Sequence, residues 1–456
     1  MYTPHTDEDI RRMLERIGVG SVDELFARAV PGEMLTSGGF EDVPEAMDLA
    51  SLIKTMRALS DRNTASCIGS CFAGGGAYAH LVHPAVDQII SRSEFLTAYT
   101  PYQAEVSQGT LQAVFEFQTM VAELLGTQVA NASMYDGASA AAEAALMARR
   151  VTKRNKVLVS EALHPEYRHV IRTYLAGLAP EGVEEVLTIG YAKDTGATDT
   201  VALAGRLGDD VAAVVVGYPN VFGVVEDLTS IAKAAHDAGA LLVTATAEPV
   251  SLGILEAPAV LGADIPTAEG QALGLPVSFG GPGVGLFGCS KKKARHMPGR
   301  LVGRTVDTRG KNGYVLTLAM REQHIRRERA TSNICTNQGL CALAVTVHLS
   351  LLGPEGLREQ ALMSAANAHA LRERIAALDG FEDVFDGPFF NEFAIRSKRV
   401  PVADLIEGLA ERRLLAGPAL GRWYPELANV LLVSTTECLC TQDMDALVAA
   451  LREVGR

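Results

Sequence analysis

Features that would place the chain in a specialised class are scarce in its 456 residues. There is one Trp against 43 Gly and 19 Pro, a balance that indicates many tight turns rather than a sandwich of aromatic strands. No uninterrupted apolar run reaches the ~18 residues that a membrane helix needs. The N-terminus is acidic and lacks a basic region followed by an apolar stretch, so it does not resemble a secretory signal. We therefore expect a cytoplasmic protein without a membrane span.

Metal-binding patterns are missing as well. The seven cysteines include no Cys-x-x-Cys pair and no Cys/His cluster at zinc spacing, which indicates reduced thiols. His80 and His83, and likewise His164 and His169, have the spacing of a ligand pair, but neither pair has an evident third ligand. We expect no metal site.

The chain also lacks an excess of basic residues. Its net charge of −13 repels phosphate backbones and argues against broad nucleic-acid binding. Hydrophobic residues at 48 % and charged residues at 21 % are typical of a globular protein. At ~150 residues per domain, the length suggests two or three units around one large core.

From about residue 128, short apolar runs alternate with amphipathic stretches, for which we predict helices over 138–150, 165–175 and 228–238. Strand, helix and strand repeated in this way indicate right-handed crossovers and a mostly parallel sheet that is covered on both faces. The predicted strands are 128–133, 156–160, 185–189, 211–217 and 241–245.

The two ends of the chain have a different pattern. Near the N-terminus, Ser21 and Glu24 outline a capping box, and Pro44 is predicted to begin a further helix. After about residue 330, a long helix that breaks at Gly353 and Pro354 precedes short strands and helices. We predict three parts: an N-terminal helical extension over 1–75, a large α/β domain over 76–330 and a small C-terminal α+β domain over 331–456.

Two glycine-containing turns each allow two interpretations. Residues 134–139 (MYDGAS) follow a predicted strand and open an Ala-rich helix, so the backbone amides there offer a seat for an anion. A tight strand-to-helix turn explains the same residues equally well. Residues 279–285 (FGGPGVG) permit close approach of the backbone to a ligand, or form an irregular connection. They match neither a Walker loop nor a dinucleotide fingerprint.

Six blocks, in the same order along nearly the whole chain, resemble glycine decarboxylase, the P-protein of the glycine cleavage system. The longest block is 95–109 (FLTAYTPYQAEVSQG), a polar, aromatic segment that is otherwise typical of a surface loop. The length of the chain suits the separate first (alpha) subunit of two-subunit P-proteins. The other blocks are 131–138 (NASMYDGA), 279–282 (FGGP), 297–300 (MPGR), 321–327 (REQHIRR) and 331–336 (TSNICT).

The resemblance implies a pyridoxal-phosphate (PLP) enzyme of fold type I, with a mostly parallel seven-stranded sheet in the large domain and a smaller C-terminal α+β domain. It also implies glycine dehydrogenase activity (aminomethyl-transferring, decarboxylating), in which PLP accepts the electron pair left by carbon dioxide. The aminomethyl group passes to the lipoylated H-protein in this family.

The same resemblance implies that the chain lacks a cofactor of its own. PLP requires a lysine for its internal Schiff base, and by the family's spacing Gln271 stands where that lysine would be. An amide cannot form an imine. We therefore expect no catalytic residue on this chain, and PLP on a lysine-bearing beta subunit within a heterotetramer of two alpha and two beta subunits. The vestigial cofactor site would comprise Asp136, Gly137, Ala138 and Glu248.

Active sites of fold type I enzymes lie at a subunit interface, so the resemblance implies that this chain lends residues to its partner. We expect the first three of the following residues in the partner's glycine pocket and the last three near the partner's PLP phosphate. They are Tyr99, Tyr102, Gln103, Ser332, Asn333 and Thr336.

Three alternatives remain open at this point. The chain is a specialised P-protein-like subunit for another small amino acid or carrier, a non-catalytic scaffold homologue, or a self-sufficient PLP enzyme that uses Lys293.

Overall fold

The structure is a computed structural model that describes residues 4–35, 42–63, 70–178 and 185–455. The chain divides into two compact units, residues 1–64 and residues 65–456, which are treated separately below. The predicted boundaries at residues 75 and 330 stay predictions.

The first unit consists of short helices, as its sequence suggests. Ser21 caps the second of them by accepting from the amide of Glu24, whereas the Glu24 carboxylate accepts from Gly20. The prediction that a helix begins at Pro44 is wrong. The helix begins at Leu49, because the side chain of Asp48 accepts from the amide of Ser51 and caps the first turn. The elements are α1 (Asp7–Ile17), α2 (Val22–Ala29), the 3-10 turn Gly32–Met34 and α3 (Leu49–Ser60).

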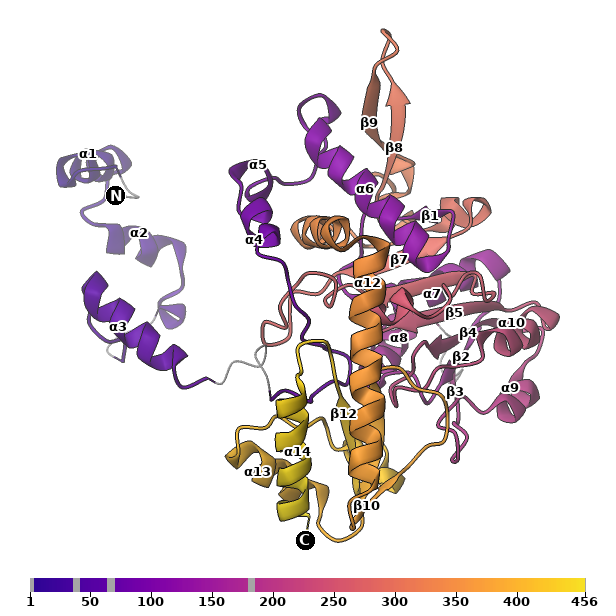
Figure 1. Ribbon diagram of the computed structural model, residues 1–456. Helices are drawn as coiled ribbons and strands as arrows, with labels where there is room; N and C mark the ends of the chain where they lie inside the picture. The colour runs from indigo at the N-terminus through magenta and orange to yellow at the C-terminus, as the bar shows by residue number, and fades with distance from the viewer. Residues whose placement is uncertain (1–3, 36–41, 64–69, 179–184, 456) are drawn as a thin grey trace. The chain divides into compact units, whose positions relative to one another are not determined.

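A seven-stranded sheet forms the centre of the second unit (Figure 1). Its strand order is β1-β7-β6-β5-β4-β2-β3; the last five run parallel and β7 is antiparallel to both of its neighbours. This order confirms the predicted mostly parallel sheet. The strands are β1 (Val129–Ala130), β2 (Lys156–Ser160), β3 (Val186–Ile189), β4 (Val211–Gly217), β5 (Leu241–Thr246), β6 (Ile265–Glu269) and β7 (Gly285–Cys289).

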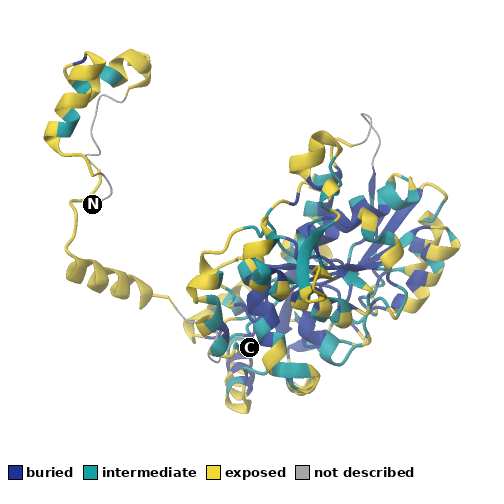
Figure 2. Ribbon diagram, turned by 90° about the horizontal axis from the view of Figure 1, so that it is seen from above, coloured by how far each residue is buried: buried dark blue, intermediate teal, exposed yellow. Residues whose placement is uncertain are grey.

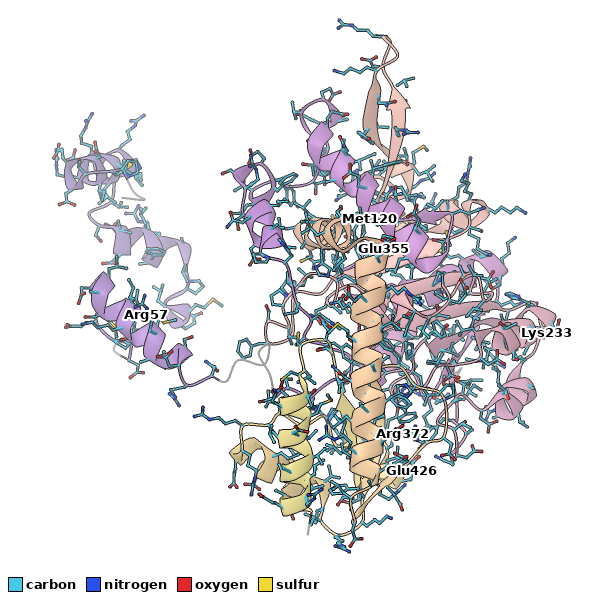
Figure 3. All side chains as sticks on the ribbon, in the orientation of Figure 1. Arg57, Met120, Lys233, Glu355, Arg372 and Glu426 are labelled. Carbon is cyan, nitrogen blue, oxygen red and sulfur yellow. The ribbon has the colours of Figure 1, made fainter. Side chains whose placement is uncertain are left out.

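Helices cover both faces of this sheet, and β4 shows why its sequence is apolar throughout. Ala213 and Val215 pack in a cluster with α7 and α8, whereas Val214 and Val216 pack in a second cluster with α9 and α10. Figure 2 shows the buried residues gathered in the sheet, and Figure 3 labels Lys233 on the outer side of α10. The helices are α7 (Gly137–Thr152), α8 (Pro165–Leu175), α9 (Thr200–Arg206) and α10 (Leu228–Asp237).

Beside the β1 edge of the sheet lies a group of elements, a hairpin and several helices, that the sequence analysis did not predict together. A two-stranded hairpin of β8 and β9 packs against α6, which in turn contacts β1 and β7. Short helices precede α6 and follow the hairpin. The elements are α4 (Ala85–Ile90), α5 (Ser93–Leu96), α6 (Gln108–Leu125), β8 (Leu301–Val306), β9 (Asn312–Thr317) and α11 (Gln323–Arg326).

The long helix α12 (Gly339–Ala376) links the sheet to the C-terminal part. It breaks at Gly353, whose φ of 62° lies in the left-handed region, as the Gly-Pro pair predicted. Figure 3 labels Glu355 just after this break and Arg372 farther along. Among the described helices, α12 is the one long and apolar enough to cross a membrane, a criterion that core helices also meet. Its Ala342 and Val345 are buried in a cluster with residues of α6.

The C-terminal part is a small α+β layer, in agreement with the sequence pattern. Three antiparallel strands in the order β10-β11-β12 pack with two helices around one hydrophobic cluster. The elements are β10 (Phe381–Asp383), β11 (Glu392–Ser397), α13 (Val402–Glu411), β12 (Val430–Ser434) and α14 (Thr441–Val454).

An aromatic cluster joins this layer to the large sheet. The ring of Phe222, in the connection after β4, lies 4.7 Å from the ring of Phe385, 5.1 Å from Tyr424 and 4.9 Å from Tyr191, measured between centroids. Phe222 is 1 % exposed. The packing of the two layers therefore depends on a fully buried ring.

We predict that Phe222→Ala lowers the free energy of unfolding by about 3–5 kcal/mol, because it leaves a cavity among three aromatic rings. Urea denaturation followed by fluorescence measures the change. Phe279→Ala is the matched control, since Phe279 is 95 % exposed, and it is expected to stay within about 0.5 kcal/mol of the wild type. Equal effects of the two substitutions would contradict the role of the cluster.

Candidate functional site

Ligands of open α/β sheets bind beyond the carboxyl ends of the parallel strands. In this chain, the cavity at the ends of β2, β4 and β5 has a volume of only about 10 Å³, which is room for one water molecule at most. Side chains from the N-terminal segment of the second unit and from β11 fill the remaining space. The lining includes Gly76, Tyr78, His164, Tyr167, Gly217, Ala247 and Glu392.

Gln271 lies two residues after the end of β6, and both ends of its amide are hydrogen-bonded. Its Oε1 accepts from the backbone amide of Tyr78 at 3.2 Å, and its Nε2 donates to the carbonyl of Leu275 at 2.8 Å. The side chain is buried. Gln271 is thus a structural link between β6 and residue 78, and its amide cannot condense with an aldehyde.

The carboxylate of Glu269, the last residue of β6, lies at the N-terminus of α7. Oε2 accepts from the amide of Gly137 at 2.8 Å, and Oε1 accepts from the amides of Val284 at 2.9 Å and Gln271 at 3.0 Å. Burial raises the pKa of Glu269 to about 7, although the three amides oppose the rise. The tight strand-to-helix turn predicted for residues 134–139 is confirmed, and the amide of Gly137 donates to a side chain of the same protein.

The other residues of the predicted vestigial cofactor site make capping, packing and hydrogen-bonding contacts within the protein. Asp136 caps α7 by accepting from the amide of Ser139 at 2.7 Å. Ala138 is half-buried against the main hydrophobic cluster. Glu248 accepts a hydrogen bond from the amide of Val250 at 3.0 Å and faces His80. Of the four residues, Gly137 alone donates to a bound anion, and that anion belongs to the protein.

His80 lies between two buried carboxylates. Its Nε2 is 3.0 Å from Glu248 Oε2, and its Nδ1 is 2.6 Å from Glu437 Oε2. Burial alone would lower the pKa of His80, but the two carboxylates raise it to about 10. The ring is therefore an imidazolium at neutral pH, and it bridges the connection after β5 to the connection after β12.

Glu392 is a further buried carboxylate in the same region. Glu392 Oε1 accepts from the amide of Gly75 at 2.6 Å, and Oε2 accepts from the hydroxyl of Tyr78 at 3.0 Å. Burial raises the pKa of Glu392 to about 8. With the strand ends filled in this way, with an amide after β6 and with a carboxylate in the anion seat, the residues present do not fit PLP.

A larger cavity, of about 270 Å³, opens beside α6 and the start of α12. Tyr99 and Thr336 line it together with Arg300, whose guanidinium donates to Thr100 Oγ1 at 3.2 Å. Arg300 is buried and paired with Glu322, and it lies 5.5 Å from the centre of the Tyr102 ring. The structure thus brings three of the six predicted partner contacts to one place, although Tyr102 does not line the cavity itself.

The remaining predicted contacts lie elsewhere. Ser332 and Asn333 line a separate cavity of about 690 Å³, where Ser332 donates to Glu143 at 2.7 Å. Gln103 is exposed and lines neither cavity. Within the described ranges, no three His, Cys, Asp or Glu side chains are grouped so that they could hold a metal ion.

The model of the family described as glycine cleavage system P-protein matches residues 1–451. The chain belongs to this family. Probable glycine dehydrogenase (decarboxylating) subunit 1 of Rhodospirillum rubrum is 52 % identical over 456 residues, which cover 99 % of each chain. The Sorangium cellulosum protein of the same name is 49 % identical over 452 residues, which cover 99 % of this chain and 98 % of that protein.

Solved structures agree with this assignment to the P-protein family. A crystal structure of glycine decarboxylase (P-protein) of the glycine cleavage system, in inhibitor-bound form, has a TM-score of 0.88 at 46 % identity, with 100 % of both chains covered. Mouse CSAD, at 16 % identity, a TM-score of 0.69 and coverage of 96 % and 93 %, shows the shared fold alone. The predicted family and the predicted fold class, PLP-dependent fold type I, are confirmed.

Several residues of this P-protein family member escaped the sequence analysis. Glu269 carried one usable signal, a charged residue followed by glycine at the end of an apolar stretch. Glu392 and Glu437 carried none. His80 was considered only as a metal ligand with His83, because its carboxylate partners lie more than a hundred residues away along the chain. Arg300 was present in a matched block, but nothing in the sequence marked it as buried.

We predict that His80→Gln lowers the free energy of unfolding by about 3–5 kcal/mol near neutral pH, because two buried carboxylates lose their shared cation. The folded pKa of about 10 lies above the ordinary value of 6.5, so this stabilisation is fully present below pH 6.5. It is then lost as the pH rises toward 10. Urea denaturation of both proteins between pH 6.5 and 10 should show the difference shrinking.

His169→Gln serves as the control for this series. His169 is exposed, and its Nδ1 lies 3.8 Å from the Glu166 carboxylate, so the substitution should stay within about 0.5 kcal/mol of the wild type at every pH. A His80→Gln effect that did not change with pH would show that the ring is neutral in the folded protein.

Proposed function

We propose that this chain is the alpha subunit of a two-subunit glycine dehydrogenase (aminomethyl-transferring, decarboxylating) and is inactive alone. The observation that supports the proposal is the buried amide of Gln271, which is hydrogen-bonded at both ends. By the spacing of the P-protein family, this residue stands where an imine-forming lysine is expected. The names of the subunit 1 relatives support a partner chain of a second kind.

In the proposed assembly, PLP is bound by a lysine-bearing beta subunit, where it supplies the electron sink for glycine decarboxylation. Two alpha and two beta subunits form a cytoplasmic heterotetramer, and the lipoylated H-protein receives the aminomethyl group. The relatives lend no support to another amino acid or to a scaffold without catalytic purpose, because their names specify glycine dehydrogenase.

The contribution of this chain is then made at its outer face. Tyr99 is 74 % exposed beside the Arg300 cavity, so its ring is available to a neighbouring subunit. Tyr102 lies against the guanidinium of Arg300, which fixes the phenol in place. We assign Tyr99, Tyr102 and Gln103 to the partner's glycine pocket, and we place Ser332, Asn333 and Thr336 near the partner's PLP phosphate.

The first test concerns the cofactor. PLP added to the purified chain, followed by borohydride, should leave no stoichiometric adduct on any lysine. The alternative residue Lys293 donates to Asp264 at 2.8 Å, so its side chain is engaged in an ion pair. Mass spectrometry of peptides locates any adduct, and the reconstituted alpha–beta pair should show one on the beta subunit. A single modified lysine on this chain would contradict the proposal.

The second test concerns the interface. Tyr102→Ala should lower kcat/KM for glycine of the reconstituted pair by about 10-fold or more, since a positioned contact of 1.4 kcal/mol corresponds to one decade. Complex formation and PLP content should not change. Val201→Ala, at an 83 % exposed site of α9, is the control expected to leave the rate and KM unchanged. An unchanged kcat/KM in Tyr102→Ala would remove this residue from the site.

A further inference from the structure

The seat occupied by the Glu269 carboxylate has the construction of an anion site. Its three amides come from three separate segments: Gly137 from the first turn of α7, Gln271 from the turn after β6, and Val284 from the glycine-rich connection before β7. Amides at the start of a sixteen-residue helix attract negative charge. Hydrogen bonds from amides to an ionised group are also stronger than those to a neutral one.

Glycine forms two walls of this seat. A Cβ on Gly283 would lie 3.0 Å from both carboxylate oxygens of Glu269, and a Cβ on Gly137 would lie 2.9 Å from the Glu269 Cβ. The carboxylate therefore packs directly on bare backbone on both sides. No second anion can share the seat while Glu269 is there.

We propose that Glu269 is an internal ligand: its carboxylate fills an amide cradle for phosphate, and by filling it keeps phosphate-bearing molecules out of this chain. The cradle is formed by the amides of Gly137, Gln271 and Val284. Glu269→Ala removes the Cγ, the Cδ and both carboxylate oxygens, one heavy atom fewer than inorganic phosphate contains, so the vacated seat is close to that ion in size. The inference concerns the chain's own fold and is independent of the proposed function.

The surroundings determine which phosphate compound the opened seat accepts. The Tyr167 hydroxyl lies 2.3 Å from where a Cβ on Gly137 would stand, and the neighbouring cavity holds about 10 Å³. A pyridine ring has no room there, whereas inorganic phosphate needs the seat alone. Asp136 lies close enough to raise the pKa of Glu269, so its charge opposes a second anion in the seat.

The experiment measures the melting temperature of wild type and Glu269→Ala at pH 8, in sodium phosphate and in sodium chloride of equal ionic strength. Saturating phosphate should raise Tm of Glu269→Ala by about 2 °C or more and leave the wild type unchanged. Adding Asp136→Asn, which keeps a capping side chain and removes a charge, should enlarge the shift. Equal melting temperatures in both salts would overturn the proposal.

Glu226→Ala is the matched control. Glu226 is also buried, but it accepts from one backbone amide, that of Thr198, together with the side chains of Thr198 and Asn220. Its removal should lower Tm without creating a phosphate effect. The same phosphate-induced shift in Glu226→Ala would reduce the Glu269 result to a general salt effect and overturn the inference.

Glu269→Gln decides the matter if Glu269→Ala does not fold. Its amide is isosteric, so the seat stays full, but its NH2 group faces backbone donors and carries no charge. We expect a lower Tm than the wild type at pH 8 and no response to phosphate. A Tm equal to that of the wild type would show that the side chain of residue 269 fills the seat as a neutral group and not as an anion.

Discussion

A buried carboxylate must find donors inside the protein, and this requirement organises the middle of the second unit. Three glutamates lie at the carboxyl ends of the parallel strands, and each has different hydrogen-bond donors. Glu269 uses three backbone amides, Glu392 uses an amide and a phenol, and Glu248 uses a histidine. No Lys or Arg takes part in these described contacts. Where related folds leave space for a ligand, this chain has a closed polar core.

Because side chains fill the centre of the second unit, the candidate functional residues are those around its outer cavities. The cavities beside Arg300 and beside Ser332 are both open to the surface, and the residues that resemble the P-protein blocks surround them. The chain thereby combines the fold of the P-protein family with a centre whose residues do not fit PLP. Family membership and a glutamine at position 271 are compatible because the fold and the site depend on different residues.

The central sheet could be predicted from the sequence because its strands are continuous apolar runs, as β4 illustrates. The strand β6 was missed because Pro266 and Thr267 interrupt its pattern, although the sheet accommodates both. The start of α3 was misplaced because a capping side chain, not a proline, determined it. Contacts such as Glu269 with Gly137 join positions 132 residues apart, and neither periodicity nor spacing contains that information.

His80 joins two halves of the second unit through a single ring. Glu248 follows a strand of the large sheet, and Glu437 follows the last strand of the small layer. Separating these two halves would therefore leave one cation and two carboxylates without their ion-pair partners. Hinge-like breathing of the C-terminal layer is therefore costly. The large sheet and the C-terminal layer are thereby held together in one arrangement.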